Sequence, residues 1–320
     1  MNMLKLAVVG SLVVFSFNAQ AQNVTVLGGG LKGGAYAMAV GLSKLLKEKT
    51  DMNVQPQTSG GMVAQARILN KGDADFAFGI GGPIGAWAYN GQKRFEKEGA
   101  KKNLRAVMAY PFGNLQWVTL ADSSVKTLTD LRGKTVSVGK ASSTTQTFAR
   151  IFFDAHGIKL TELKETTPGF AGGFNQLRNG NVDGHLTVGT TPISGLREMS
   201  TTKEFRLIHM DPIVIKKLAA DIGSGITIDT IAPDAYGKAQ KNAKPVTTLG
   251  LFFGFSTSTS TPPDVVYKVT KALFENLDEY KKATKKAKAV TLDAACEGLA
   301  FPLHEGALRY YKEIGHKGCM

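Results

Sequence analysis

The sequence predicts an α/β protein of two lobes, each built on a parallel or mixed sheet, and the lobes are joined by two crossing strands. Short β-rich runs alternate with helical segments over residues 23–90, and a second alternating series follows over 134–207. This alternation is typical of a parallel sheet covered by helices on both faces. Two extended apolar runs, LQWVTLA at 115–121 and VTTLGLFFGFS at 246–256, lie far apart in the sequence. We expect them to pair as the strands that cross between the lobes.

The first series is predicted to start with a strand at 23–29. A helix at 35–49 follows, with apolar residues at helical spacing. Next come an extended segment at 53–59, a helix at 61–70 and a buried strand at 74–80. These elements form the first lobe.

The second series contains predicted strands at 134–140, 181–189 and 205–211, with helices at 143–157, 170–178 and 191–200. A late amphipathic helix reaches residue 280, with Thr261 as its expected N-cap, and is expected to pack across the first lobe. We therefore assign residues 22–117 and 250–320 to the first lobe and residues 118–249 to the second.

Residues 1–21 have the features of a secretory signal peptide. Lys5 precedes an apolar run from Leu6 to Phe17, and an Ala-Gln-Ala triplet ends at Ala21. The alternative, a membrane anchor, is disfavoured because this run is too short to cross a bilayer of roughly 30 Å. Cleavage after Ala21 removes 21 of the 320 residues and leaves 299 in an exported protein.

The chain is strongly basic, with a formal net charge of +13. The densest lysine cluster, at 281–289, follows an amphipathic helix and is interpreted as a solvated face. Export also separates the protein from most nucleic acid, so we expect no nucleic-acid partner. What remains is a positive field that favours small anions.

The two cysteines, Cys296 and Cys319, lie in the last twenty-five residues. In an oxidising compartment two thiols this close in sequence are more often paired than reactive. We predict a disulfide that holds the C-terminal helix against the body, and the alternative is two free buried thiols.

Catalytic and cofactor signatures are mostly absent, so no metal or cofactor is expected. The five histidines show no HExxH or His-x-His spacing, and there is no G-x-S-x-G nucleophile elbow. Gly28–Gly33 fits G-x-G-x-x-G, but a lone match in a glycine-rich run is weak. Asp183 and His185 alternate with apolar residues on a strand, and we interpret them as a strand-entry Asp and a half-buried His.

Instead, small residues recur between a strand and the helix that follows it. We call these junctions helix mouths: residues 33–36, 59–61, 79–83, 142–146 and 189–192. Helix N-termini offer unpaired N–H groups and partial positive charge, and Ser and Thr hydroxyls add directional hydrogen bonds. One such turn alone would be ordinary capping. Five of them over two lobes indicate a binding cleft for a small anion.

The sequence as a whole resembles the TAXI family of substrate-binding proteins, which serve TRAP (tripartite ATP-independent periplasmic) transporters. The resemblance spans nearly the whole mature chain and is carried by GGAYAMAVGLSKLLKE, VQPQTSGGMVAQARILNKGDADFAFG, VDGHLTVGTTPISGL and PLHEGALRYYKEIG. It implies a type II-like periplasmic binding fold, which closes on a small organic acid such as glutamate or 2-oxoglutarate. It also implies delivery of that acid to integral membrane transporter subunits.

The resemblance and the helix mouths together give a set of candidate ligand-binding residues: Gly34, Ala35, Tyr36, Ser59, Gly60, Gly61, Gly81, Ser143, Thr144, Thr145, Gln146, Phe170, Gly189, Thr190 and Thr191. Three departures from the family pattern stand out. Ala35 replaces a common Thr, Gln146 is neutral where an acid is common, and GIGGP at 79–83 replaces a more polar stretch. Because these changes remove polar partners, we expect a carboxylate ligand without an amine. The rival hypotheses are an exported enzyme with Asp183 or His185 as base, and a binding protein that serves a sensor.

Overall fold

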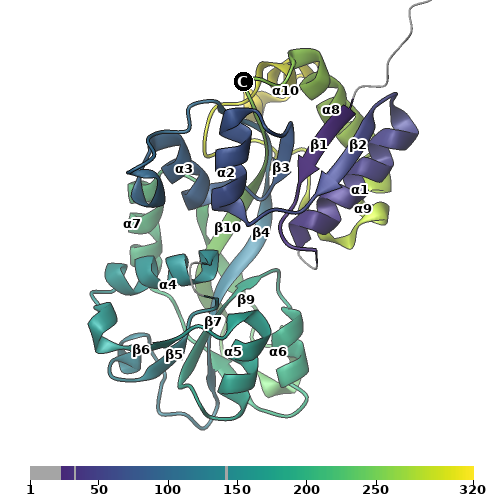
Figure 1. Ribbon diagram of the computed structural model, residues 1–320. Coiled ribbons are helices and arrows are strands. Elements are labelled where there is room, and N and C mark those ends of the chain that lie inside the picture. The colour runs from purple at the N-terminus through teal and green to yellow at the C-terminus, as the bar shows by residue number, and fades with distance from the viewer. Residues whose placement is uncertain (1–22, 32–33, 141–142) are drawn as a thin grey trace, which may run out of the picture.

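The computed structural model describes residues 23–31, 34–140 and 143–320, and the predicted signal peptide lies outside them. Figure 1 shows two groups of helices and strands, which we call the first and second lobes, joined by two long strands that run between them. This arrangement confirms the predicted α/β class with a mixed sheet.

The first lobe starts with three parallel strands: β1 (Asn23–Leu27), β2 (Asn53–Gln57) and β3 (Phe76–Phe78). The helices between and after them are α1 (Gly34–Lys49), α2 (Met62–Lys71) and α3 (Gly82–Asn90). Buried apolar residues at helical spacing on α1 pack toward the sheet, as their sequence spacing predicts.

The second lobe repeats this pattern with β5 (Thr135–Ser137), β6 (Lys164–Thr166) and β7 (Gly184–Gly189) as parallel strands. Its helices are α4 (Thr144–Ala155), α5 (Gly169–Arg178) and α6 (Ser194–Met199). The short 3-10 helices of the chain are Lys93–Phe95, Thr129–Leu131, Leu160–Glu162, Gly237–Ala239, Lys285–Ala289 and Lys317–Cys319.

The crossing strands are β4 (Leu104–Leu120) and β10 (Val246–Ser258), which pair antiparallel from Gly250 opposite Asn114 to Ser258 opposite Leu104. Beyond this shared segment β10 pairs with β9 (Ile226–Ile231), and β4 pairs with β7 and with β8 (Phe205–Leu207). Helix α7 (Pro212–Ile222) connects β8 to β9.

Hydrogen bonding therefore unites both lobes in one ten-stranded sheet of order β2-β1-β3-β10-β4-β7-β5-β6, with β8 and β9 beside it. We predicted two separate sheets, and the difference follows from strand length. With 17 residues in β4 and 13 in β10, each strand finds partners in the first lobe at one end and in the second lobe at the other.

The C-terminal segment returns to the first lobe as α8 (Pro263–Glu275), α9 (Leu277–Ala283) and α10 (Glu305–Glu313). The single helix predicted to reach residue 280 is interrupted at Asn276. The predicted N-cap is also wrong by one residue, because Pro262 occupies that position and the Thr261 hydroxyl instead donates to the Asp75 carbonyl. Cys296 and Cys319 form the predicted disulfide, with their Cα atoms 5.3 Å apart.

The core of the first lobe depends on residues from both ends of the chain. Phe255 of β10 stacks between Phe76 and Phe78 of β3, at ring-centroid distances of 5.2 and 4.3 Å.

None of the helices that the structure describes combines the length and apolar character needed to span a bilayer.

Candidate ligand-binding site

The first two helix mouths meet at Gly28, directly after β1. A Cβ on Gly28 would lie 2.4 Å from the Cα of Tyr36 in α1, so only glycine allows this approach. On its other side the Gly28 carbonyl accepts the Ser59 hydroxyl, and the Ser59 N–H donates to Gly29. The Ser59 hydroxyl also accepts from the N–H of Gly61 at 3.3 Å. The structure thus brings the predicted residues of α1 and α2 together at one edge of the sheet.

The Ser59 side chain is already engaged within this junction. Its hydroxyl hydrogen goes to Gly28, so toward a ligand it can offer only acceptor capacity. The donors left for an anion are backbone N–H groups at the starts of α1 and α2.

Gln65 lies beneath this junction and was missed by sequence reasoning. Its side chain is 1% exposed, and its Nε2 donates to the carbonyls of Gly28 (2.8 Å) and Phe78 (3.1 Å). It therefore links the ends of β1 and β3 to α2. A Gln on a helix carries no sequence signal for such a role, because an exposed Gln would fit the same position.

Lys286 is a second residue that the sequence did not reveal. A Cβ on Gly34 would lie 3.6–3.9 Å from three carbons of the Lys286 side chain, so this lysine crosses the start of α1. Its segment is docked by Thr284, which packs against Gly41 of α1. A cation beside a helix N-terminus is unfavourable for the helix alone and favourable for a bound anion. Lys286 is exposed, as are Lys282, Lys285 and Lys288, so the cluster is the solvated face that the sequence predicts, and Lys286 in addition lies at a helix mouth.

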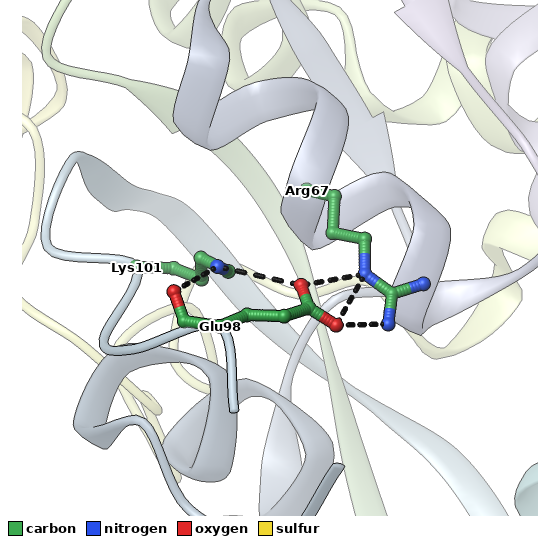
Figure 2. Close-up of polar contacts among 3 residues, drawn as sticks. All are labelled: Arg67, Glu98 and Lys101. Carbon is green, nitrogen blue, oxygen red and sulfur yellow. Dashed lines mark hydrogen bonds and ion pairs between the residues drawn. The ribbon is translucent and has the colours of Figure 1, made fainter. Parts of the chain in front are cut away.

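The end of α2 away from its mouth is anchored by an ion-pair cluster (Figure 2). Arg67 directs its guanidinium to the carboxylate of Glu98, with Nε at 2.9 and 3.1 Å from the two oxygens. Lys101 approaches the same carboxylate at 3.5 Å and donates to the Glu98 carbonyl. Hydrogen bonding from Arg67 lowers the pKa of the Glu98 carboxyl. The cluster ties α2 to the loop before β4.

Gly81, predicted at the third mouth, is buried against the crossing strand β10. A Cβ on Gly81 would lie 2.4 Å from the backbone nitrogen of Gly254. The next residue, Gly82, has φ of +50° and a Cβ there would lie 2.9 Å from the Phe252 carbonyl oxygen. The GIGGP turn is therefore glycine-rich because two backbones pack closely, and a ligand contact at Gly81 remains a prediction.

The fourth mouth opens α4 in the second lobe. Ser143 is its N-cap and accepts from the N–H of Gln146 at 3.2 Å, while Thr145 packs on Gly139. The Gln146 side chain is only 7% exposed, and its Nε2 lies 3.3 Å from a carboxylate oxygen of Glu165. Gln146 thus faces β6.

Glu165 supplies a carboxylate near α4 that sequence reasoning did not place. The same oxygen lies 3.2 Å from a guanidinium nitrogen of Arg150, which offsets its charge. The predicted ligand contacts of Thr144 and Phe170 involve side chains outside the described part of the chain, so they remain predictions.

The fifth mouth, after β7, is bound to the crossing strand β4. The Thr190 hydroxyl donates to the Phe112 carbonyl at 2.8 Å. Gly113 has a φ of +145° and approaches Gly189 closely. A Cβ on Gly113 would lie 2.2 Å from the carbonyl carbon of Gly189. These contacts fix the mouth to the region where the strands cross.

Thr191 belongs to a buried polar network at the same crossing. Its hydroxyl donates to Asn114 (3.1 Å) and accepts from Gln116 (2.8 Å), whose amide oxygen accepts the Tyr236 hydroxyl (2.7 Å). Asn114 in turn donates to Asp229 of β9 at 2.9 Å. Burial raises the pKa of Tyr236, so its hydroxyl remains a donor. The network links β4, β7 and β9.

Asp183 and His185, the two candidate catalytic bases, both make hydrogen bonds to strand β5. The Asp183 carboxylate accepts the N–H of Thr135 at 2.9 Å. His185 is 1% exposed, not half-buried as predicted, because Gly173 of α5 packs directly on its ring. Its Nδ1 lies 3.1 Å from the Ser137 hydroxyl, and burial lowers its pKa to about 4.

Crossing strands with helix mouths on either side define a two-lobed α/β protein. Within that class the chain belongs to the NMT1-like family, whose model matches residues 26–315.

Solved structures with similar folds cover most of the chain. XAC2383 from Xanthomonas citri, solved with ATP and with chloride ion, has a TM-score of 0.50 at 12% identity over 93% of this chain and 97% of its own. The periplasmic aliphatic sulphonate binding protein SsuA from Escherichia coli gives 0.46 at 12% identity over 92% and 84%. A putative L-cystine ABC transporter from Listeria monocytogenes gives 0.44 at 16% over 86% and 98%. At these identities the likeness concerns the fold.

Proposed function

We propose that this protein is a periplasmic solute-binding protein that captures a small organic acid anion, a carboxylate, and delivers it to the integral membrane subunits of a TRAP transporter. The observation that carries the proposal is the convergence at the start of α1. There the mouths of α1 and α2 meet at Gly28, and the ammonium-bearing side chain of Lys286 crosses Gly34. Backbone N–H groups, a helix dipole and a cation are all suited to a carboxylate.

A binding role is favoured over catalysis by the state of the two candidate bases. Asp183 holds a backbone N–H of the neighbouring strand, and His185 is buried. The enzyme hypothesis requires one of them to reach a substrate, whereas the ring of His185 is covered by Gly173 and one carboxylate oxygen of Asp183 accepts a backbone N–H. A protein that must release its ligand unchanged needs donors and no base.

We further propose that residues 22–117 with 250–320 move as one lobe and 118–249 as the other, closing on the acid about β4 and β10. TRAP delivery rests on the resemblance to the TAXI family, and the periplasmic location rests on the predicted signal peptide.

Ligand screening of the mature protein tests the binding role. Thermal-shift assays with organic acids and amino acids, and native mass spectrometry of what co-purifies, should show stoichiometric binding of an acid with a raised Tm and no product. Turnover of the bound acid would favour the enzyme hypothesis, and failure of every acid to bind would overturn the proposal.

Uptake measurements test the transporter class. With the cognate membrane subunits in vesicles, an imposed ion gradient should drive uptake of the acid in the absence of ATP. Uptake that requires ATP hydrolysis would exclude a TRAP system, and a sensor role would give binding without any uptake.

A further inference from the structure

A cavity of about 520 Å³ lies on the side of the molecule where helix α7 is placed between α3 and α4 (Figure 1). Its volume is within the range of small-molecule binding sites. The first lobe contributes the end of α3 and the 3-10 helix that follows it, the second lobe contributes the C-terminal part of α4, and the C-terminal half of α7 forms the third wall. We call this space the α7 cavity.

The α7 cavity is distinct from the helix mouths. Its lining on α4 begins at Ile151, whereas the mouth of α4 is at Ser143. Ile151 lies eight positions after Ser143, which is about 12 Å along a helix. None of the mouth residues that the structure describes, apart from those on other elements, lines this cavity either. The cavity is therefore a candidate for a second site.

One part of the cavity lining is apolar. Trp87 of α3 and Leu218 of α7 line it while being 5% and 7% exposed. Ile151 of α4 and Ile222 of α7 line it as well, and both pack against the buried cluster that contains Trp87. These contacts hold the walls together and leave an apolar surface on which the body of a ligand can lie.

The rest of the lining carries charges of both signs. Lys217 and Asp221 lie four residues apart and therefore on one face of α7. Lys93 and Asp154 add one charge of each sign from the other two walls. All four residues are exposed, and the ion pairs among the described residues include none of them. Ammonium groups and carboxylates are thus both available to a ligand.

The backbone of the wall after α3 supports a binding role. Lys93 has a φ of +54°, in the left-handed region that glycine adopts most easily, and among the described residues it is the only one other than glycine there. The carboxylate of Glu96, which also lines the cavity, holds this turn by accepting the Lys93 N–H at 3.0 Å. Backbone conformations of this kind are unfavourable and cluster at functional sites.

We propose that the α7 cavity binds an amino acid with an apolar side chain, in its zwitterionic form. The carboxylate of the ligand pairs with Lys217, its ammonium group pairs with Asp221, and its side chain lies against the apolar lining. A ligand with one charge would satisfy only one of the two groups on α7. This second site goes beyond the proposed capture of an acid at the helix mouths and does not depend on it.

Tryptophan fluorescence and calorimetry test the inference. The chain has two tryptophans, and Trp117 is fully buried in β4. Phenylalanine or leucine at millimolar concentration should change the emission of the wild type, and Trp87→Phe should abolish that change. In calorimetry, the amino acid should bind about threefold more tightly than its analogue without the carboxylate or without the amine, as expected for one exposed ion pair. For phenylalanine these analogues are phenethylamine and 3-phenylpropionate. For leucine they are isoamylamine and 4-methylpentanoate. Equal affinities within a series, or no change in emission with either amino acid, would overturn the inference.

Three glutamine substitutions locate the site. Lys217→Gln should remove the preference for the amino acid over its amine analogue. Lys216→Gln is the matched control, because Lys216 is exposed on the same helix and does not line the cavity. Lys286→Gln, at the mouth of α1, should leave the affinity for the amino acid unchanged. Equal loss in Lys217→Gln and Lys216→Gln, or loss only in Lys286→Gln, would show that the α7 cavity does not hold the amino acid. Neither result would bear on whether an acid binds at the helix mouths.

Discussion

Lys286 brings a positive charge to the start of α1, and its replacement tests whether that charge contributes to ligand binding. We expect Lys286→Gln to weaken binding of the acid that most raises the Tm of the wild type by about threefold, the size typical of an exposed ion pair. Added salt should weaken wild-type binding more than binding to the variant, because salt screens this charge. Isothermal titration at two ionic strengths measures both effects.

Lys288→Gln is the matched control for that change, since Lys288 is exposed in the same short 3-10 helix. It removes the same charge without the contact at Gly34. Equal weakening by both substitutions would mean that the ligand senses only the net charge of the protein.

The buried imidazole of His185 predicts a pH dependence of stability. Its pKa of about 4 in the folded protein is below the ordinary value of 6.5, so the unfolded chain binds more protons between these values. The stability that neutral His185 contributes is complete above pH 6.5 and is lost as pH falls toward 4. Denaturant titrations of wild type and His185→Gln from pH 4 to 7 should show a steeper fall in the wild type. Parallel curves would exclude His185 as the cause.

Residue-scale predictions from the sequence succeeded where local chemistry was sufficient. Ser143 was identified at a mouth and caps α4, and the two cysteines pair. The burial of His185 was underestimated because strand alternation gives the face of a side chain, and only the packed structure shows that Gly173 covers it. The position of Lys286 likewise depends on a distant contact between Thr284 and Gly41.

At the scale of elements, the anchoring of α2 is open to a direct test. Because hydrogen bonding from Arg67 lowers the pKa of Glu98, the pair stabilises the fold above the ordinary carboxyl pKa, and this contribution is lost as pH falls through the lowered value. Thermal melts of wild type and Glu98→Gln should therefore differ near neutral pH and converge as the pH falls through the lowered pKa of Glu98. A Tm difference that persists in acid would indicate a packing effect of the substitution.

Strand β4 shows why the length of an element is harder to predict than its presence. We placed the crossing strand at 115–121, whereas β4 begins at Leu104. Pro111 and Gly113 in its middle are residues that usually interrupt strands. The structure accommodates them with a change of register between the pairs Leu251–Gly113 and Phe252–Pro111, which leaves Phe112 as the extra residue.

For the whole molecule, the disulfide makes a prediction about stability. Cys296 and Cys319 close a loop with a sequence separation of 23, and a loop of this size stabilises a fold by about 2–4 kcal/mol. The double variant Cys296→Ser/Cys319→Ser should melt at a lower temperature than the oxidised wild type, as measured by circular dichroism. Reduction of the wild type should reproduce the shift, and an unchanged Tm in both cases would mean that the bond adds no stability.

The two-lobed architecture was predictable because strand–helix alternation and two long apolar runs are local patterns. The single continuous sheet was not, because it depends on which strands meet across more than a hundred residues of sequence. The same limit applies to Gln65, whose hydrogen bonds join three separate segments of the chain, at Gly28, at α2 and at Phe78.

The pairing of β3 with β10 also constrains when, during synthesis of the chain, the first lobe can complete its sheet. Residues 76–78 are translated long before their partners at 255–257, and Phe255 is missing from the first core until then. A nascent chain that ends before β10 lacks the strand that pairs with both β3 and β4, so the sheet of the first lobe is incomplete. The sheet of this lobe can therefore be completed only after most of the chain has been synthesised, and until then the β3 edge that pairs with β10 has no strand partner there.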